Sequence, residues 1–267
     1  PCRACVRDFE DLKNRFGIGT TIIRFKELVD ERDRIIKSRY LMEEIENRTD
    51  ELIRNAQGVH VDREQLKGEF LYHFTIKELM NKYNCNAFSI ECFEFCATKL
   101  PDKWKICPCL NHSLLKDEGY PSACEGDICA LLSEMVLMGL TKKSALMGNM
   151  NLTRKGMKRD WVDEKWVNGA DTEGDKLWVG HNVPGLKMLG FDKSDLPYEI
   201  RNFINAKPTY PGWGASFKID FNKIKEKTVT IVGFGTLATE MLVTTGKVIG
   251  MRGFNSTGCT TGVILDV

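Results

Sequence analysis

Apolar side chains recur at helical spacing in three stretches of the first half of the chain. The most apolar stretch, residues 124–140, predicts a buried helix. Residues 62–83 predict a second helix, for which Asp62 is a suitable N-cap. Residues 26–56 carry a looser apolar stripe among many charges. This stretch therefore predicts a long helix that lies mostly in solvent.

Short apolar runs around these helices predict strands. Residues 86–95 predict a buried strand with its exit loop, and shorter runs predict strands at 20–25, 104–110 and 144–148. A strand, a helix and a strand follow one another around the most apolar helix. This order favours an α/β layer with a parallel sheet.

The pattern changes after about residue 150, where long helical stretches stop and Trp, Gly, Pro and Thr become more frequent. Short strand patterns separated by turns follow at residues 176–179, 215–221, 228–232, 242–250 and 262–267. Such a succession is typical of a small antiparallel barrel or sandwich. The sequence therefore predicts an α/β fold in two parts, a parallel-sheet α/β domain over residues 1–141 and a C-terminal antiparallel β-barrel-like domain over residues 142–267.

Composition and charge disfavour two kinds of binding partner, namely nucleic acid and membranes. The chain has 267 residues, of which 42% are hydrophobic and 28% charged, as in globular proteins. The formal net charge is +1, so bulk electrostatics favour neither nucleic acid nor an anionic membrane. No apolar run reaches the roughly 18 residues of a spanning helix. We therefore expect neither nucleic acid nor a membrane as a partner.

Ten cysteines occur in the chain, several of them within apolar patterns, where a free thiol behaves as a small hydrophobic group. A chain of this length does not need disulfides, and we expect a reducing, cytoplasmic environment. A structural zinc site would use Cys2 and Cys5 together with Cys107 and Cys109. Neither spacing is followed by a matching second half at zinc-ribbon distance, which disfavours this alternative.

Two carboxylates, Glu125 and Asp127, stand at the start of the most apolar helix. An unpaired buried charge is costly, so they need partners. The partners are either backbone N–H groups of the first helical turn, or a metal ion or a proton. His181, at a predicted strand end, and His112, in the loop before the helix, could add an imidazole, although each could equally be a hydrogen-bonded structural residue. Such a mixed set would suit Mn²⁺, Mg²⁺ or Zn²⁺, with Mn²⁺ favoured.

Residues 228–238 imitate a dinucleotide-binding fingerprint, with a strand followed by Gly233, Gly235 and Ala238. The fingerprint also needs a helix, a second strand and an acidic residue roughly 20 positions further on. Too little chain follows for these elements. Glycines at a bend between antiparallel strands explain the motif better than a nucleotide-dependent oxidoreductase does.

Three blocks of the sequence resemble the L-fucose isomerase group, which shares a superfamily with L-arabinose isomerase. They are residues 109–128, with a Glu-x-Asp at the helix start, residues 145–149 and residues 180–184. The resemblance implies an active cleft between the two predicted domains, and a homo-oligomer. It also implies a further N-terminal domain ahead of Pro1, which helps to cover a neighbouring subunit's site.

The resemblance implies an aldose–ketose isomerase that holds one Mn²⁺ through a glutamate, an aspartate and a histidine. By motif, the glutamate falls on Glu125 and the histidine on His181, whereas Asn149 occupies the aspartate position. An amide is a weaker ligand and cannot act as a base. The metal would hold the substrate's carbonyl and hydroxyl oxygens while Glu125 moves the proton through an ene-diol. The main role expected for Asp127 is to cap the helix, and its secondary role is to replace the carboxylate missing at position 149.

Trp178, Asn182 and Trp213 are candidates for contacts with the substrate by their location near the cleft. We therefore expect a metal-dependent sugar isomerase that acts on an open-chain monosaccharide. The alternative is a divergent sugar-binding member of the same fold, which lost full metal chemistry with the carboxylate at position 149. The sequence does not identify the sugar.

Overall fold

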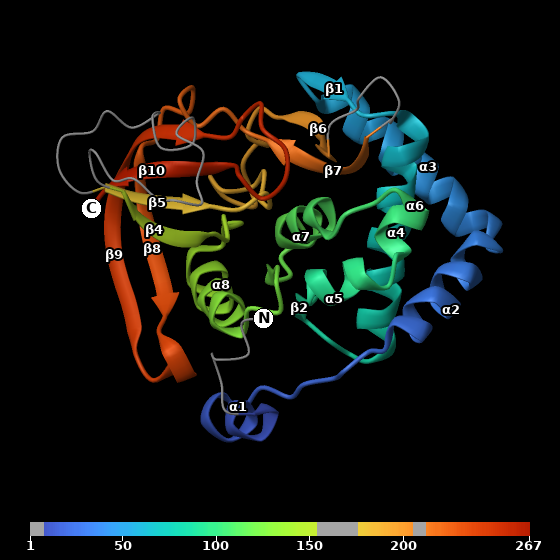
Figure 1. Ribbon diagram of the computed structural model, residues 1–267, viewed down its shortest axis with the longest axis horizontal. Coiled ribbons are helices and arrows are strands. Elements are labelled where there is room, and N and C mark those ends of the chain that lie inside the picture. Colours follow the sequence, from blue (N-terminus) through green and yellow to red (C-terminus); the bar gives the residue numbers. More distant parts are fainter. Residues whose placement is uncertain (1–7, 154–175, 205–211) are drawn as a thin grey trace.

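The structure is a computed structural model that describes residues 8–153, 176–204 and 212–267. Its helices are α1 (Phe9–Phe16), α2 (Phe25–Ile36), α3 (Arg39–Asn55), α4 (Arg63–Lys82), α5 (Cys92–Ala97), α6 (Leu100–Trp104), α7 (Pro108–Asp117) and α8 (Ile128–Thr141). Its strands are β1 (Gly58–His60), β2 (Phe88–Ser89), β3 (Ser122–Ala123), β4 (Asn149–Thr153), β5 (Lys176–Gly180), β6 (Glu199–Ile204), β7 (Trp213–Lys218), β8 (Thr228–Phe234), β9 (Met241–Arg252) and β10 (Gly262–Asp266). Helices α2 to α6 lie on one side of the molecule and the largest sheet on the other, with α7 and α8 between them (Figure 1).

The predicted helices are present, with adjusted ends. Helix α4 matches the prediction for residues 62–83, and the carboxylate of Asp62 accepts a hydrogen bond from the N–H of Glu64 at 2.8 Å. The helix predicted over 26–56 is divided into α2 and α3. The division occurs at Ser38, whose hydroxyl accepts a hydrogen bond from the N–H of Leu41 and so begins a new helix.

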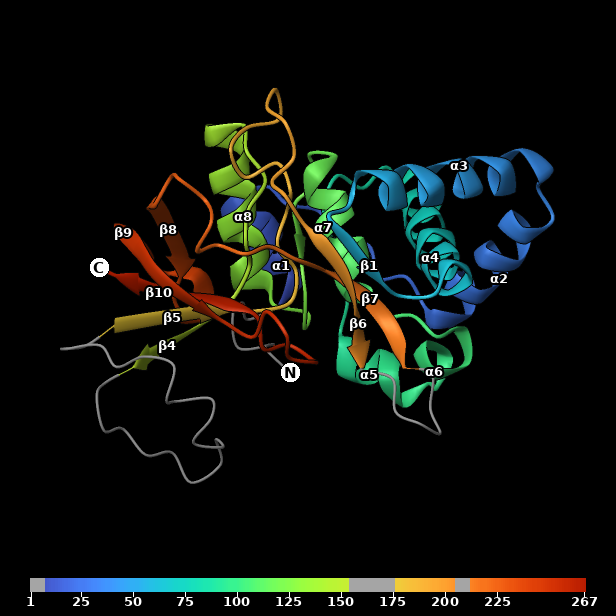
Figure 2. The same cartoon turned by 90° about the horizontal axis from the view of Figure 1, so that it is seen from above.

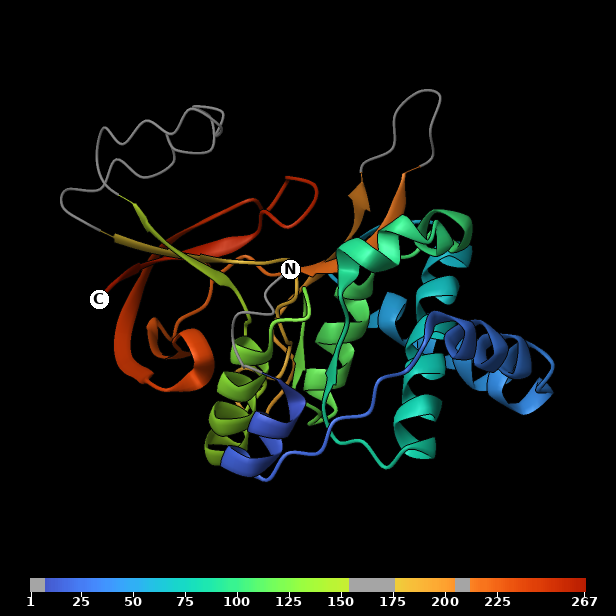
Figure 3. The same cartoon turned by 60° about the horizontal axis from the view of Figure 1, so that its bottom comes forward.

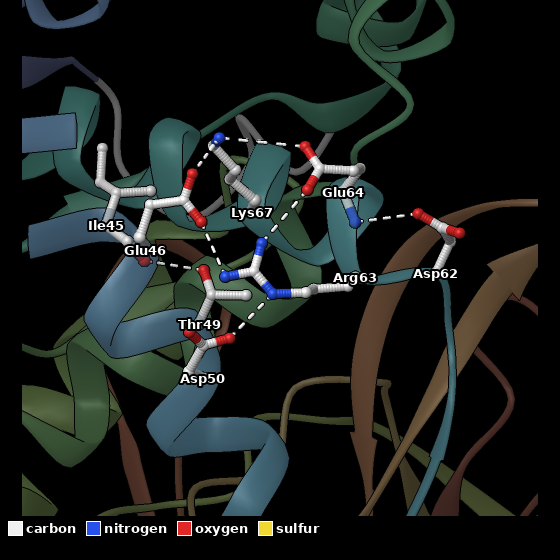
Figure 4. A network of polar contacts seen from close by, with 8 residues as sticks. All are labelled: Ile45, Glu46, Thr49, Asp50, Asp62, Arg63, Glu64 and Lys67. Atoms are coloured by element: carbon white, nitrogen blue, oxygen red, sulfur yellow. Dashed lines mark hydrogen bonds and ion pairs between the residues drawn. The ribbon is translucent and has the colours of Figure 1, made fainter. Parts of the chain in front are cut away.

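An ion-pair network joins α3 to α4 on the surface (Figure 4). The guanidinium of Arg63 donates to Asp50 at 2.8 Å and to Glu46 at 2.7 Å. Lys67 pairs with the same Glu46. Exposed pairs of this kind add little to stability, so the apolar side chains that both helices bury in the main core supply most of the packing energy.

Five strands form an antiparallel sheet in the order β4-β5-β10-β9-β8. The sheet curves beside α8 as half of a barrel (Figure 3). The backbone N–H of Phe234 on β8 donates to the hydroxyl of Ser133 on α8 at 3.1 Å, which ties the sheet to the helix. The antiparallel, barrel-like character predicted for the second part of the chain is therefore confirmed for this sheet.

The glycine motif lies at the end of β8, where the chain bends into β9. These strands pair antiparallel from Thr228 opposite Lys247 to Phe234 opposite Met241. A dinucleotide fingerprint would need a helix after β8 and then a parallel strand. The motif is therefore a bend between antiparallel strands, as the sequence predicts.

Parallel pairing is a minor feature of the described residues. Strand β1 runs parallel to β6, which pairs antiparallel with β7, and β2 pairs parallel with β3 over two residues. The fold is thus a mixed α/β arrangement in which the expected parallel sheet is only weakly developed. Because β1 precedes residue 141 whereas β6 and β7 follow residue 142, the three-stranded sheet joins both predicted domains (Figure 2).

Several strands predicted in the first half of the chain are wrong or displaced. Residues 104–110 end α6 and begin α7. The first turn of α6 contains Pro101 and the first turn of α7 contains Pro108. Proline suits the first helical turn because its missing N–H would have no partner there. The other predicted strands shrink or shift: 86–95 pairs only at Phe88–Ser89, 20–25 is irregular up to Phe25, and 144–148 gives way to β4, which begins at Asn149.

A buried carboxylate in α4 joins the segments on which the candidate site depends. One oxygen of Glu69 accepts the N–H of Cys107 at 2.9 Å and the N–H of Ala215 at 2.7 Å. The N–H of Cys107 lies just before α7 and the N–H of Ala215 lies within β7. One side chain therefore connects α4, α7 and β7. Within the described ranges, no helix is both long and apolar enough to cross a lipid bilayer.

Candidate metal centre

The candidate centre forms where β5 ends between β4 and β10. At this point Gly180 lies opposite Asn149 on one side and Gly262 on the other. A Cβ atom on Gly180 would lie 2.1 Å from the ring of Trp178, so only glycine lets the strand pass this ring. The next residue, His181, is fully buried.

Glu125 reaches the same point from the loop between β3 and α8. Its φ of 62° is left-handed, which costs a residue with a side chain about 1–2 kcal/mol. Gly126 follows with a φ of 65°, and a Cβ atom there would lie 2.9 Å from the carboxylate of Glu91. These two residues turn the chain sharply, so that the Glu125 side chain faces His181 while Asp127 begins the helix.

The structure brings together the three residues that the resemblance identifies as metal ligands. The Nε2 atom of His181 lies 3.2 Å from Oε1 of Glu125. The Nδ2 atom of Asn149 lies 3.5 Å from Oε2 of the same carboxylate. Rotation of the Asn149 amide by half a turn would present its oxygen to the same point.

Charge interactions favour an ion pair between Glu125 and His181 when no metal is bound. The hydrogen bond from His181 lowers the pKa of Glu125, against the opposing effect of partial burial. Burial disfavours a charged His181, but the hydrogen bond to Glu125 and nearby thiols outweigh burial and raise its pKa. A divalent ion would therefore displace a proton from this imidazole.

Asp127 acts as the N-cap of α8, which is the first of the two roles predicted for it. Its Oδ1 atom accepts a hydrogen bond from the N–H of Ala130 at 2.9 Å. A carboxylate in this position also interacts favourably with the helix dipole. Its predicted role in catalysis stays a prediction.

Asn182 is buried beside the centre and is engaged within the protein. Its Oδ1 atom accepts hydrogen bonds from Lys218 at 2.8 Å and from Thr261 at 3.1 Å, and its Nδ2 atom donates to Ser216 at 2.7 Å. Burial lowers the pKa of Lys218 to about 8. These contacts fix the segment after His181, which favours a positioning role for Asn182 over the predicted contact with substrate.

The two predicted tryptophans come from different sheets, Trp178 from β5 and Trp213 from β7. Trp178 packs against the glycines at the end of β5, and its Nε1 atom is buried without a hydrogen-bond partner among the described residues. Trp213 is half-buried, with its ring 5.8 Å from that of Phe203, and packs in the cluster that contains Cys124. Contact of either side chain with a substrate stays a prediction.

The second candidate histidine, His112, is a buried neutral imidazole behind the centre. Its Nδ1 atom lies 2.7 Å from the Ser122 hydroxyl. Burial lowers its pKa well below the usual value, and the charges of Lys116 and His181 act in the same direction. Its Nε2 atom has no partner among the described residues.

Thiols surround the centre, and sequence reasoning did not connect them with it. Cys107, Cys109 and Cys124 are buried in one cluster, against which Cys92 packs. A hydrogen bond from Cys124 lowers the pKa of the Cys92 thiol. Hydrogen bonding with Cys109 lowers the pKa of the Cys259 thiol to about 7. No sequence spacing relates these cysteines, because they come from separate elements.

A cavity of about 420 Å³ lies between α8 and the inner face of the half-barrel sheet. Leu137, Ile231 and Val263 contribute to its mainly apolar wall, and Asn149 lines it. Glu125 and His181 do not line it. The candidate centre is thus at the edge of the cavity.

The donor atoms fit a divalent ion. Nitrogen and oxygen ligands about 2.1 Å from a metal lie about 3.0 Å apart at adjacent corners of an octahedron. The separation of 3.2 Å between Glu125 and His181 is close to this value. The described part of the chain contains no group of three or more His, Cys, Asp or Glu residues placed to hold a metal. The candidate centre has two such residues, Glu125 and His181, and its third member is the amide of Asn149. Cys2 and Cys5 of the zinc alternative lie outside the described residues.

The chain was compared with models of known protein families and with curated proteins, and neither comparison finds a match. The resemblance to the L-fucose isomerase group, including the further N-terminal domain, therefore stays a prediction. A function for the centre has to be inferred from its own side chains and their positions.

Proposed function

We propose that the protein is a divalent-metal-dependent sugar isomerase, which interconverts an aldose and a ketose in open-chain form. One observation carries the proposal: Glu125, Asn149 and His181 come from three separate segments and lie side by side. The carboxylate of Glu125 is 3.2 Å from the imidazole of His181 and 3.5 Å from the amide of Asn149. They are the positions at which the resemblance implies a metal site. The finer two-domain fold of that group, a homo-oligomer and a cytoplasmic location belong to the same proposal.

The three side chains would hold Mn²⁺ or a similar ion through a carboxylate, an amide oxygen and an imidazole. The bound ion would supply positive charge that polarises the substrate carbonyl. Glu125 is the residue suited to carry the proton between the two carbons, because it is the only carboxylate of the three. Asn149 can donate a hydrogen bond but cannot take a proton, so we expect slow turnover.

Calorimetric titration with Mn²⁺ tests the metal site directly. We expect the wild type to bind one ion, Glu125→Gln to bind at least about 100-fold more weakly, and Asn149→Asp to bind about tenfold more tightly. Asp127→Asn is a matched control, because asparagine also caps helices and leaves the three ligands in place. Ketose formation from a panel of aldoses, with and without Mn²⁺, then tests the reaction.

A second candidate function is sugar binding without isomerisation, and the neutral amide at position 149 favours it. In that case the wild type would bind an aldose without forming a ketose. If the wild type binds no divalent ion and only Asn149→Asp gains one, the isomerase proposal for this protein fails. The sugar-binding function would then be tested by titration with aldoses and open-chain polyols.

A further inference from the structure

Two of the thiols beside the candidate centre face each other. The sulfur atoms of Cys92 and Cys124 are 3.8 Å apart. Cys92 is the first residue of α5, and Cys124 immediately precedes Glu125. The pair therefore connects the start of a helix to the loop that positions the proposed metal ligand.

The backbone around this pair is fixed by the short parallel pairing of β2 and β3. Phe88 lies opposite Ser122 in this pairing. The N–H of Gly126, two residues after Cys124, donates to the carbonyl of Ile90, two residues before Cys92, at 2.9 Å. Hydrogen bonds thus hold both segments side by side, and the two thiols stay close without a covalent link.

The two thiols differ in their access to solvent. Cys92 is half-buried, whereas Cys124 is only 2% exposed. A small oxidant can therefore reach Cys92 first. Cys124 is then placed to complete the reaction from within the protein.

We propose that Cys92 and Cys124 form a reversible disulfide when the protein meets a small disulfide such as oxidised glutathione. The Cys92 thiolate attacks one glutathione sulfur and expels a glutathione thiolate, which leaves a mixed disulfide on Cys92. The Cys124 thiolate then attacks the Cys92 sulfur and expels the second glutathione. The two protein thiols lose two electrons and two protons, and one glutathione disulfide becomes two glutathione molecules.

The disulfide has a consequence for Glu125, and this part rests on the proposed function. A disulfide bond is about 2.05 Å long, so the two sulfur atoms must approach each other by about 1.8 Å. We expect the loop at Cys124 to contribute to this movement, together with rotation of the two side chains. Glu125 is the next residue, in a strained left-handed conformation, so its carboxylate shifts relative to His181. Oxidation should therefore weaken metal binding.

Peptide mapping tests the bond itself. The protein is incubated with oxidised glutathione, free thiols are blocked with N-ethylmaleimide, and the chain is cleaved after glutamate without reduction. Cleavage after Glu91, Glu94, Glu118 and Glu125 isolates the two cysteines in the peptides 92–94 and 119–125. We expect these two peptides to be joined first, and to separate after treatment with dithiothreitol.

Two variants control this experiment. Cys92→Ser removes the more accessible thiol of the pair and should leave Cys124 free to react with N-ethylmaleimide once the protein is unfolded. Cys96→Ser removes an exposed thiol of the same helix and should leave the cross-link intact. A Cys92 that keeps glutathione, or that pairs with another cysteine while Cys124 stays reduced, would overturn the proposal.

Mn²⁺ titration of the reduced and oxidised proteins separates this inference from the proposed function. We expect the oxidised form to bind Mn²⁺ at least about tenfold more weakly, with recovery after reduction. Equal affinities in both forms would refute the effect on Glu125. If the cross-link forms but the reduced protein binds no metal, the disulfide stands and the proposed function falls.

Discussion

Two buried polar groups lie near α8, and their construction differs. At the closed group, the ammonium of Lys116 donates to Glu134 at 3.2 Å and to the Val183 carbonyl at 2.6 Å. The second oxygen of Glu134 accepts the N–H of Ser122 at 2.8 Å. Each of these buried charged atoms has a partner, and the group joins α7 to α8 and to the chain after β5.

The candidate metal centre is the second group, called open here because its hydrogen bonding is incomplete. His181 is equally buried, yet its Nδ1 atom has no partner among the described residues. Glu125 adopts a left-handed conformation that costs energy. Complete hydrogen bonding is what a structural cluster needs, whereas unused donors and strain are typical of sites that bind a ligand. The two groups therefore differ in that every charged atom of the closed group has a partner, whereas the open group combines a ring nitrogen unused within the described part of the chain with a strained residue.

The largest effect is expected from breaking the closed group. Lys116→Met leaves Glu134 buried without its cation and should lower the free energy of unfolding by about 3–5 kcal/mol. The double variant Lys116→Met with Glu134→Leu should recover much of this loss, because neither charge remains. Urea unfolding followed by circular dichroism measures both. Equal losses in the single and the double variant would show that the pair itself is not responsible.

A partly exposed cluster should give an intermediate effect that depends on pH. Burial opposes ionisation of Glu118, but the hydrogen bonds from His73 and Lys77 outweigh it and lower the pKa to about 2. Since the folded state lowers this pKa, the stabilisation is present above about pH 4.5 and is lost as the pH falls toward 2. We expect Glu118→Gln to cost about 1–2 kcal/mol at pH 7, after allowance for solvent screening. Unfolding curves of the variant and the wild type should converge near pH 2.

A comparison of two substitutions at one residue isolates the strain in the open group. Glu125→Gly and Glu125→Ala both remove the carboxylate, but only glycine accepts a left-handed backbone without penalty. We expect the glycine variant to be more stable than the alanine variant by about 1 kcal/mol, and both to lose Mn²⁺ binding. Urea unfolding and calorimetric titration provide the two measurements. An alanine variant as stable as the glycine variant would indicate that the loop relaxes out of this conformation.

The smallest effect is expected at the exposed network of Figure 4. Arg63→Met removes three surface ion pairs but leaves the apolar core beneath them unchanged. The urea midpoint should move only slightly, and the difference should vanish at high salt because exposed charges are screened. A shift as large as that of Lys116→Met would contradict the distinction between buried and exposed pairs.

The parts of the fold that could be predicted have local causes. Helix α4 follows from Asp62 and the apolar spacing after it, and the bend after β8 follows from Gly233 and Gly235. The segment over 104–110 was predicted as a strand because its apolar residues alternate too briefly to distinguish the two structures. The prolines at 101 and 108 were the signal for helix starts there.

The candidate centre was predictable only in part. Glu125 and Asp127 attract attention as acids beside an apolar helix, but only the resemblance linked the former to Asn149 and His181. Cys92 and Cys124 are 32 positions apart and are brought together by a two-residue parallel pairing that no local pattern reveals. Contacts of this kind depend on the tertiary fold and are invisible to periodicity.

The pairing of β1 with β6 limits how early the three-stranded sheet can form during synthesis. The side chain of Asn202 donates to the carbonyl of His60 across 142 positions of the chain. At a translation rate of about 5–20 residues per second, β1 waits on the order of 10 s for its partner strand. The three-stranded sheet is therefore completed by residues synthesised after both Glu125 and His181.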